Sequence, residues 1–380
     1  MIHPPQNDSS HVKNGPGNLR GAGRLIALDA ARGLAVIGMY LQHFALNEWN
    51  ASIVSGNTTL LFVLCGGISY SIMAQRMKER NTEAASFRAR MLARAVFVDL
   101  IGYLLIMFNT PYGVILPAYA ALFVLALMLV HRSTRVLLAT AVALWLLAPP
   151  LMILGGSILS KAYLLEDIAG GPMSALALAP AFVAGLVIGR LDLARIRTAL
   201  SLAGSGLVMV VTGKILAIYV LPGLHRSFEA WLVSVLGIVQ TPPDQYAIWP
   251  LNVDPPLWHM LLATAPHTAS SFQTLIGLGT AFLVLGIVFL VPKSITAVLQ
   301  PFAAVGRVAL TMYALQFLVV WVLSLSGIEY SLGEVRFGDL IVVIITLAAG
   351  WIIARLPNGP LETLMRRFDG LFSPQRPTSA

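Results

Sequence analysis

The feature that most constrains this chain is a set of ionisable side chains within an apolar stretch near the amino terminus, LIALDAARGLAVIGMYLQHFAL. Ionisable residues are costly in lipid, so inside a membrane-spanning segment they mark a functional site by default. Steps of three and four residues place five positions on one helical face, which must look into protein or water. These positions are Asp29, Arg32, Val36, Tyr40 and His43. Arg32 and His43 are eleven positions apart, which is roughly 16 Å of helix, so the pattern predicts a site that reaches across a membrane.

Composition supports a membrane protein. The chain has 57% hydrophobic and 11% charged residues and a mean hydropathy of +0.79, which a soluble domain does not show. The formal charge of +8 comes largely from short loops between apolar segments, where Lys and Arg are topology signals, so we expect no nucleic-acid partner. The single cysteine, Cys65, excludes disulfides within the chain and thiolate metal clusters.

Apolar segments recur along the whole chain, and most are close to the length that crosses hydrocarbon. They begin near residues 25, 57, 95, 113, 136, 173, 199, 272, 308 and 338. We therefore expect an all-α, polytopic integral membrane protein with about ten transmembrane helices. Most Lys and Arg fall on one side if the amino terminus is cytoplasmic, which predicts that both ends are cytoplasmic.

The predicted organisation is one membrane domain between two tails. Residues 1–23, rich in Pro, Asn, Ser and Gly, predict a disordered cytoplasmic tail, residues 24–368 the membrane domain, and residues 369–380 a second cytoplasmic tail. An outer loop, 222–271, is longer than a helix connection needs. Within it, HRSFEAWLVSVLGIVQ has the pattern of an interfacial or re-entrant helix. Its Pro-rich and aromatic remainder fits either a lid or an aromatic belt at the headgroups.

His43 is the leading catalytic candidate, as a general base or a transient acyl carrier. The structural alternative is a helix-capping or interhelical hydrogen bond. Asp29 and Tyr40 share its face and complete the predicted catalytic set. Asp29 and Arg32, three residues apart, also fit an intrahelical ion pair that makes their burial tolerable.

A second polar constellation lies in GRVALTMYALQF. Arg307 is placed to bind phosphate at the cytoplasmic mouth, with Tyr313 and Gln316 offering hydrogen bonds deeper in the membrane. The alternative is a positive-inside anchor followed by a polar interhelical contact. Together with Arg32, these three residues are the predicted cofactor-binding set.

Polar residues expected near the outer side form the predicted acceptor-binding set. They are Asn47, Glu48, Asn57, Lys214 and His267. Lys214 either snorkels to the outer surface or pairs with a carboxylate such as that of Glu48. The spacing of the outer-loop histidines matches no metal-binding motif, so we expect no metal.

Two groups of motifs resemble known families. RLIALDAARGLAVIGMYLQH and SGNTTLLFVLCGGISYSI resemble the first two helices of heparan-α-glucosaminide N-acetyltransferase-like proteins of the transmembrane acyltransferase superfamily. APHTASSFQTLIGLGTAF, GRVALTMYALQF and PNGPLETLMRR resemble the carboxy-terminal half of the bacterial YeiB-like branch. By this resemblance His43 matches the essential histidine of the superfamily and Arg32 its paired arginine. The segments between these motifs show no signature that aligns, and the large luminal domain of the animal enzymes is missing.

The resemblance implies a multi-pass acyltransferase of the bacterial inner membrane that modifies cell-envelope glycans. Acetyl-coenzyme A, or another acyl-coenzyme A, is the expected co-substrate, and the acceptor is a glycan, glycolipid or amino sugar. Membrane lipids and a possible homodimer are the other expected partners. The main alternative is a transporter or lipid flippase that uses the same polar face as a pathway, and a third is a scaffold for cell-envelope assembly.

Overall fold

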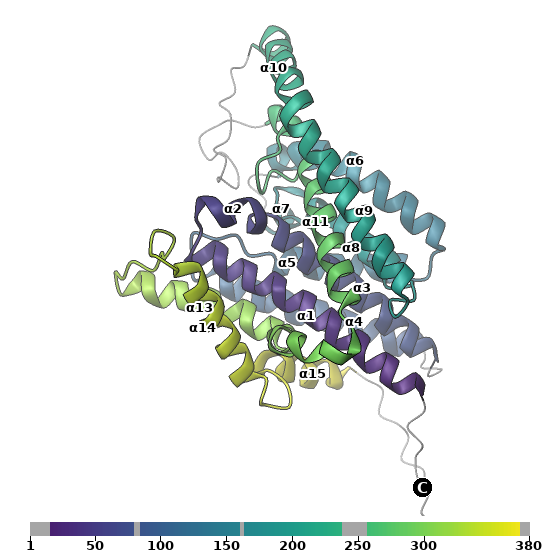
Figure 1. The fold of residues 1–380 in the computed structure, drawn as a ribbon. Coiled ribbons are helices and arrows are strands. Elements are labelled where there is room, and N and C mark those ends of the chain that lie inside the picture. The colour runs from purple at the N-terminus through teal and green to yellow at the C-terminus, as the bar shows by residue number, and fades with distance from the viewer. Residues whose placement is uncertain (1–15, 80–83, 160–162, 238–256, 373–380) are drawn as a thin grey trace, which may run out of the picture.

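The computed structural model describes residues 16–79, 84–159, 163–237 and 257–372 (Figure 1). Within these ranges the regular secondary structure is entirely helical, without a strand. The predicted all-α class is therefore confirmed for the described part of the chain.

The first half of the chain folds into eight helices, several of them short. They are α1 (Pro16–Phe44), α2 (Glu48–Val54), α3 (Asn57–Glu79), α4 (Ala84–Ile106), α5 (Leu116–Leu129), α6 (Thr134–Ile158), α7 (Tyr163–Ala169) and α8 (Ala175–Ile188).

The second half adds seven α-helices, one π-helical turn and two 3-10 helices. They are α9 (Ile196–Ile215), η1 (Leu216–Val220), α10 (Leu221–Leu236), η2 (Trp258–Leu262), α11 (Ser271–Leu290), η3 (Lys293–Leu299), α12 (Gln300–Arg307), α13 (Ala309–Leu325), α14 (Gly338–Ile353) and α15 (Pro360–Leu371).

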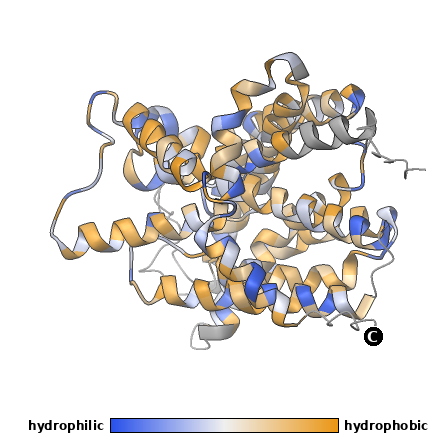
Figure 2. Ribbon diagram, turned by 90° about the horizontal axis from the view of Figure 1, so that it is seen from below, coloured by the Kyte–Doolittle hydropathy of each residue, from blue (hydrophilic) through white to orange (hydrophobic). Residues whose placement is uncertain are grey.

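Every apolar segment predicted from the sequence contains a helix. Four described helices are long and apolar enough to cross a membrane, or up to five if the bent pair α12 and α13 counts as one span. Three shorter apolar helices are α5, α8 and α14. Apolar residues dominate the ribbon in Figure 2, and many of the hydrophilic residues lie at turns and helix ends. The apolar helices indicate a membrane-embedded protein, whereas about ten spans with cytoplasmic ends stays a prediction.

Two boundaries differ from the sequence-based expectation. Helix α1 begins at Pro16, earlier than the expected end of the tail at residue 23, because proline suits the first helical position. The chain also stays helical past Pro222, since the π-helical turn η1 precedes it and Pro222 falls in the first turn of α10. The predicted interfacial helix is thus continuous with α9. The tail segments 1–15 and 373–380 and the loop segment 238–256 lie outside the described residues.

Helix α1 lies in the interior of the bundle and contacts α3, α11, α12, α13 and α14. Small residues allow this close packing: Ala31 and Ala35 are fully buried, and α12 approaches the backbone of α1 at Gly33 and Gly306. A Cβ atom on Gly306 would collide with the carbonyl oxygen of Asp29. The Asp29–Arg32 turn is therefore pressed directly against α12.

Helices α12 and α13 bend by 66° at a break between Arg307 and Ala309. Glu362 on α15 fills the break, where its Oε1 accepts hydrogen bonds from the backbone N–H groups of Leu310 at 2.8 Å and Thr311 at 3.1 Å. A carboxylate is favoured at this position because the first N–H groups of a helix lack intrahelical partners. The bend and its cap place α15 beside the start of α13, at the end of the bundle where Arg32 lies.

Candidate functional site along helix α1

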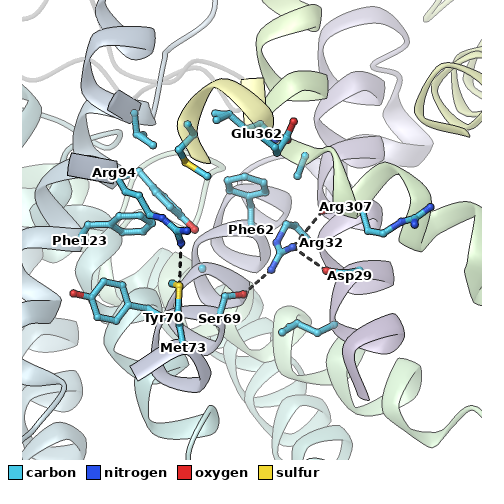
Figure 3. Close-up of a pocket in the computed structure, with 18 of the residues that line it drawn as sticks. Asp29, Arg32, Phe62, Ser69, Tyr70, Met73, Arg94, Phe123, Arg307 and Glu362 are labelled. Carbon is cyan, nitrogen blue, oxygen red and sulfur yellow. Dashed lines mark hydrogen bonds and ion pairs between the residues drawn. The ribbon is translucent and has the colours of Figure 1, made fainter. Parts of the chain in front are cut away.

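A cavity of about 380 Å³ opens where α1, α3, α4, α13 and α15 meet (Figure 3). Four arginines line it: Arg32, Arg76, Arg94 and Arg307. Aromatic and aliphatic side chains form much of the remaining wall, including Phe62. We call this space the arginine cavity.

Arg32 is held in place by three neighbours. Its guanidinium donates to Asp29 Oδ1 at 3.0 Å and to the carbonyl oxygen of Gly306 at 3.2 Å. A further hydrogen bond reaches Ser69 Oγ at 2.6 Å. The predicted intrahelical pair with Asp29 is therefore present, and the orientation of Arg32 is fixed before any ligand binds.

The other arginines divide into one held residue and two exposed ones. Arg94 donates from Nε to Asp369 Oδ2 on α15 at 2.5 Å, which ties α4 to α15. Arg76 and Arg307 are exposed and form no hydrogen bond or ion pair with the described residues. In Figure 3 the Arg307 side chain extends away from Arg32. Two guanidinium groups thus stay available for an anion at the edge of the cavity.

His43, at the other end of α1, lies in a separate pocket of about 30 Å³. Its ring stacks on Tyr112 with centroids 3.8 Å apart and meets the edge of Phe317 at 5.8 Å. His43 Nδ1 and both amide atoms of Gln316 are buried without a hydrogen-bond partner. Such groups are rare in folded proteins and indicate room for a polar ligand group or water.

His267 lines the same pocket from the segment before α11. The side-chain amide of Gln42 donates to His267 Nε2 at 2.7 Å, and burial lowers the pKa of His267 to about 4. The ring is therefore neutral near pH 7. Its backbone has a φ of 59°, which is uncommon for a residue other than glycine and is typical of positions held by their surroundings.

A third cavity, of about 340 Å³, lies beyond His267. Three residues from the predicted acceptor-binding set line it, Glu48, Asn57 and Lys214. Glu48 and Lys214 form no ion pair with each other in the described structure. Gln273 lines both this outer cavity and a smaller space next to His267. This smaller space shares His267 with the His43 pocket, so it lies between that pocket and the outer cavity.

Aromatic rings separate the His43 pocket from the arginine cavity. Phe62 lines the arginine cavity and stacks on Tyr313, which lines the His43 pocket, with centroids 6.2 Å apart. Tyr119 packs against Phe62 at 5.8 Å, and Phe317 against Tyr313 at 5.1 Å. We call Phe62, Tyr119, Tyr313 and Phe317 the aromatic layer. Its rings pack between the two pockets.

The structure divides the predicted cofactor-binding set. Arg32 and Arg307 line the arginine cavity, whereas Tyr313 and Gln316 line the His43 pocket. Tyr313 and Gln316 lie on α13, beyond the bend, while Arg307 ends α12. The bend and the helical rise therefore carry the two pairs to different pockets.

The other predicted residues also separate. Asp29 lies with Arg32 and not with His43. The Tyr40 hydroxyl donates to the carbonyl oxygen of Met312 at 2.8 Å, outside the lining of either pocket. Asn47 caps α2 by accepting from the N–H groups of Trp49 and Asn50. These positions give Tyr40 and Asn47 structural contacts.

Several site residues escaped prediction. Tyr112, Ser69 and Gln42 contact His43, Arg32 and His267, respectively. The Ser69 hydroxyl donates to the carbonyl oxygen of Cys65, one helical turn earlier. Helical spacing could therefore have predicted which face of α3 Ser69 occupies. Tyr112 lies in an irregular segment, where no periodicity indicates direction. In the described residues, no group of three or more His, Cys, Asp and Glu is placed to hold a metal ion.

Comparison with known proteins gives one match. Residues 219–370 match the model of the family described as Protein of unknown function (DUF418), a YeiB-like membrane protein family. The matched region contains His267, Arg307 and Gln316, but neither Arg32 nor His43. No curated protein and no solved structure matches this chain. The YeiB-like resemblance of the carboxy-terminal half is therefore supported, whereas the likeness to heparan-α-glucosaminide N-acetyltransferases stays a proposal.

Proposed function

We propose that this protein is a membrane acyltransferase of the bacterial inner membrane. It moves an acyl group, expected to be acetyl, from cytoplasmic acyl-coenzyme A to a sugar or glycolipid on the outer side. One observation carries the proposal. The arginine cavity and the His43 pocket, whose buried polar atoms lack hydrogen-bond partners, lie at the two ends of α1, and a polar outer cavity lies beyond His43.

The arginine cavity suits the phosphate groups of coenzyme A. Arg76 and Arg307 at its edge are free to form charge-assisted hydrogen bonds with phosphate oxygens. The apolar wall at Phe62 suits the less polar pantetheine arm, which would extend along α1 toward His43. The thioester would have to pass the aromatic layer, so we expect those rings to rotate during the catalytic cycle.

The outer cavity suits a hydroxyl-rich acceptor. Glu48, Asn57 and Lys214 supply acceptors and donors that match sugar hydroxyl or amino groups. An acceptor held there lies on the far side of His267 from the arginine cavity. The two substrates would therefore meet at His43.

His43 would act as the general base. A ring nitrogen takes the proton from the acceptor hydroxyl or amine while its oxygen or nitrogen attacks the thioester carbonyl carbon. The carbon–sulfur bond breaks, and the imidazolium returns the proton to the departing thiolate. In the alternative route, His43 itself attacks the thioester and passes the acyl group on from an acyl-histidine.

One specific observation favours the transporter hypothesis. Helices α12 and α13 form a bent pair with a 66° break next to Arg307, and transporters bind substrates at interrupted helices. Transporters usually carry such interruptions in matched pairs, whereas the described residues contain one bent pair of this kind.

The test is acetyl-coenzyme A binding to the purified full-length protein, followed by calorimetry, together with acetyl transfer to amino sugars. His43→Gln should keep the affinity and lose transfer. Arg76→Gln/Arg307→Gln should lower the affinity roughly 10-fold or more. Arg355→Gln, which removes an exposed arginine outside the cavity, is the matched control. If the wild-type protein binds no acyl-coenzyme A, the acyltransferase proposal fails and substrate flux through liposomes becomes the decisive measurement.

A further inference from the structure

A second basic cavity, of about 420 Å³, lies on the opposite side of α3 from the arginine cavity. Ser69, Met73 and Arg76 face the arginine cavity, whereas Gln75 and Lys78 face this one. Helical periodicity explains this division, because it places the two sets of positions on different faces of α3. The acyl-transfer proposal assigns this second cavity no role.

Four potentially cationic side chains converge on the cavity from three parts of the chain. Lys78 comes from the end of α3, His131 and Arg132 from the turn between α5 and α6, and Arg190 from the end of α8. No Asp or Glu is among the described residues that line the space. Such a concentration of positive charge favours an anion.

Part of this site is built in advance. Arg190 donates to the carbonyl oxygen of Val130 at 2.8 Å and to Thr134 Oγ1 at 3.2 Å. Gln75 donates to the carbonyl oxygen of Gly189 at 3.2 Å. A guanidinium has five N–H donors, so Arg190 keeps donors for a ligand after making both bonds. These contacts hold its side chain in position at little further entropic cost on binding.

Apolar surface adjoins the positive charge. Phe87 and Met77 line the cavity. Helix α4 begins at the cavity with Ala84 and α6 follows the turn that lines it, and these helices expose Leu92 and Leu138 further along. In a membrane-embedded bundle such exposed leucines face acyl chains. A ligand with a phosphate group and attached hydrocarbon fits both parts of this surface, as in basic pockets that bind anionic headgroups.

We propose that this cavity binds the phosphate of an anionic membrane lipid, such as phosphatidylglycerol or cardiolipin. The phosphate lies among Lys78, Arg132 and Arg190, and the acyl chains lie against the exposed apolar faces of α4 and α6. The same phosphate chemistry is available in free phosphate, so the test compares the two sources.

The test is native mass spectrometry of the full-length protein in detergent with added phosphatidylglycerol, and with phosphatidylcholine of the same acyl chains as the neutral comparison. The wild-type protein should retain phosphatidylglycerol in preference to phosphatidylcholine. Lys78→Gln/Arg132→Gln should weaken phosphatidylglycerol binding by roughly fivefold for each charge removed. Both side chains are exposed and make no hydrogen bond with described residues, so folding should survive. Arg197→Gln, an exposed arginine outside the cavity, is the matched control.

Three results would overturn the lipid assignment. These are equal retention of both lipids, an equal loss in Arg197→Gln, and displacement of phosphatidylglycerol by millimolar inorganic phosphate that itself binds in a Lys78-dependent way. The last result would assign the cavity to a soluble phosphate. Acetyl-coenzyme A affinity, measured on the same Lys78→Gln/Arg132→Gln protein, should equal that of wild type, which separates this proposal from the acyl-transfer proposal.

Discussion

The ring of His43 stacks on the ring of Tyr112, with centroids 3.8 Å apart, and the Tyr112 hydroxyl donates to the carbonyl oxygen of His43 at 2.7 Å. Two contacts of different kind thus fix the end of α1 and the plane of its histidine. Burial raises the pKa of Tyr112, which keeps the hydroxyl protonated as the donor. The orientation of His43 is therefore set largely by a residue from the irregular segment between α4 and α5.

This relationship predicts graded effects at position 112. Tyr112→Phe keeps the stacking and loses the hydroxyl, which bonds the carbonyl oxygen of His43 and Tyr330, so acyl transfer should fall by less than about 10-fold. Tyr112→Ala loses both contacts and should reduce transfer by about 100-fold, since small misplacements of a catalytic group are costly. Acetyl-coenzyme A affinity should stay unchanged in both, because Tyr112 is distant from the arginine cavity. Equal transfer by all three proteins would contradict a positioning role.

The Glu362 cap predicts a stability effect. Glu362→Ala removes the acceptor of the Leu310 and Thr311 N–H groups and of the Thr311 hydroxyl, which donates to Oε2 at 2.5 Å. The free energy of unfolding should fall by about 2 kcal/mol. Thermal unfolding in detergent measures the change, with Glu329→Ala, at an exposed glutamate away from the bend, as the control. A loss in Glu362→Ala no larger than in the control would show that the bend needs no carboxylate.

The close approach of α1 and α12 predicts that Gly306 tolerates no side chain. Gly306→Ala places a methyl group against the carbonyl oxygen of Asp29, which should force α12 away and break the Arg32 hydrogen bond to residue 306. We expect a destabilisation of about 1–3 kcal/mol. Gly204→Ala is the control, because open space surrounds that helical glycine and alanine is the better helix former. Equal unfolding temperatures for the two variants would contradict the packing argument.

His267 is buried in its neutral form, which predicts a pH dependence of stability. Its folded-state pKa is about 4, below the ordinary value of about 6.5. Between these values the unfolded chain binds a proton that the folded chain excludes, so stability is present above pH 6.5 and is lost as the pH falls toward 4. The contribution is at most about 1.4 kcal/mol per pH unit.

The comparison that isolates this effect is wild type against His267→Asn. Asparagine tolerates the positive φ of residue 267 and does not titrate. Unfolding temperatures measured from pH 7 to pH 4 should fall more steeply for the wild type. Parallel curves would mean that the folded protein admits the proton at His267.

Sequence reasoning located the polar face of α1 because helical periodicity alone decides which residues share a face. It placed Arg32 and His43 in separate regions, and the structure agrees. The sequence grouped Arg307 with Tyr313, but the α12–α13 bend places them in different pockets. No proline lies at the break, so the sequence gives no sign of the bend. The Arg94–Asp369 ion pair joins residues 275 positions apart, and no pattern within one sequence indicates such a contact.

The last prediction separates two roles for Tyr313, which the sequence suggested as a cofactor-binding residue. Its hydroxyl accepts a hydrogen bond from the backbone N–H of Ile115 at 3.0 Å, in a fully buried setting. Tyr313→Phe leaves that N–H group without a partner and should lower the free energy of unfolding by about 1–3 kcal/mol. Tyr219→Phe, at an exposed tyrosine, should leave stability unchanged. If Tyr313→Phe instead keeps wild-type stability and loses acetyl-coenzyme A affinity, the hydroxyl binds the co-substrate and the contact with Ile115 is dispensable.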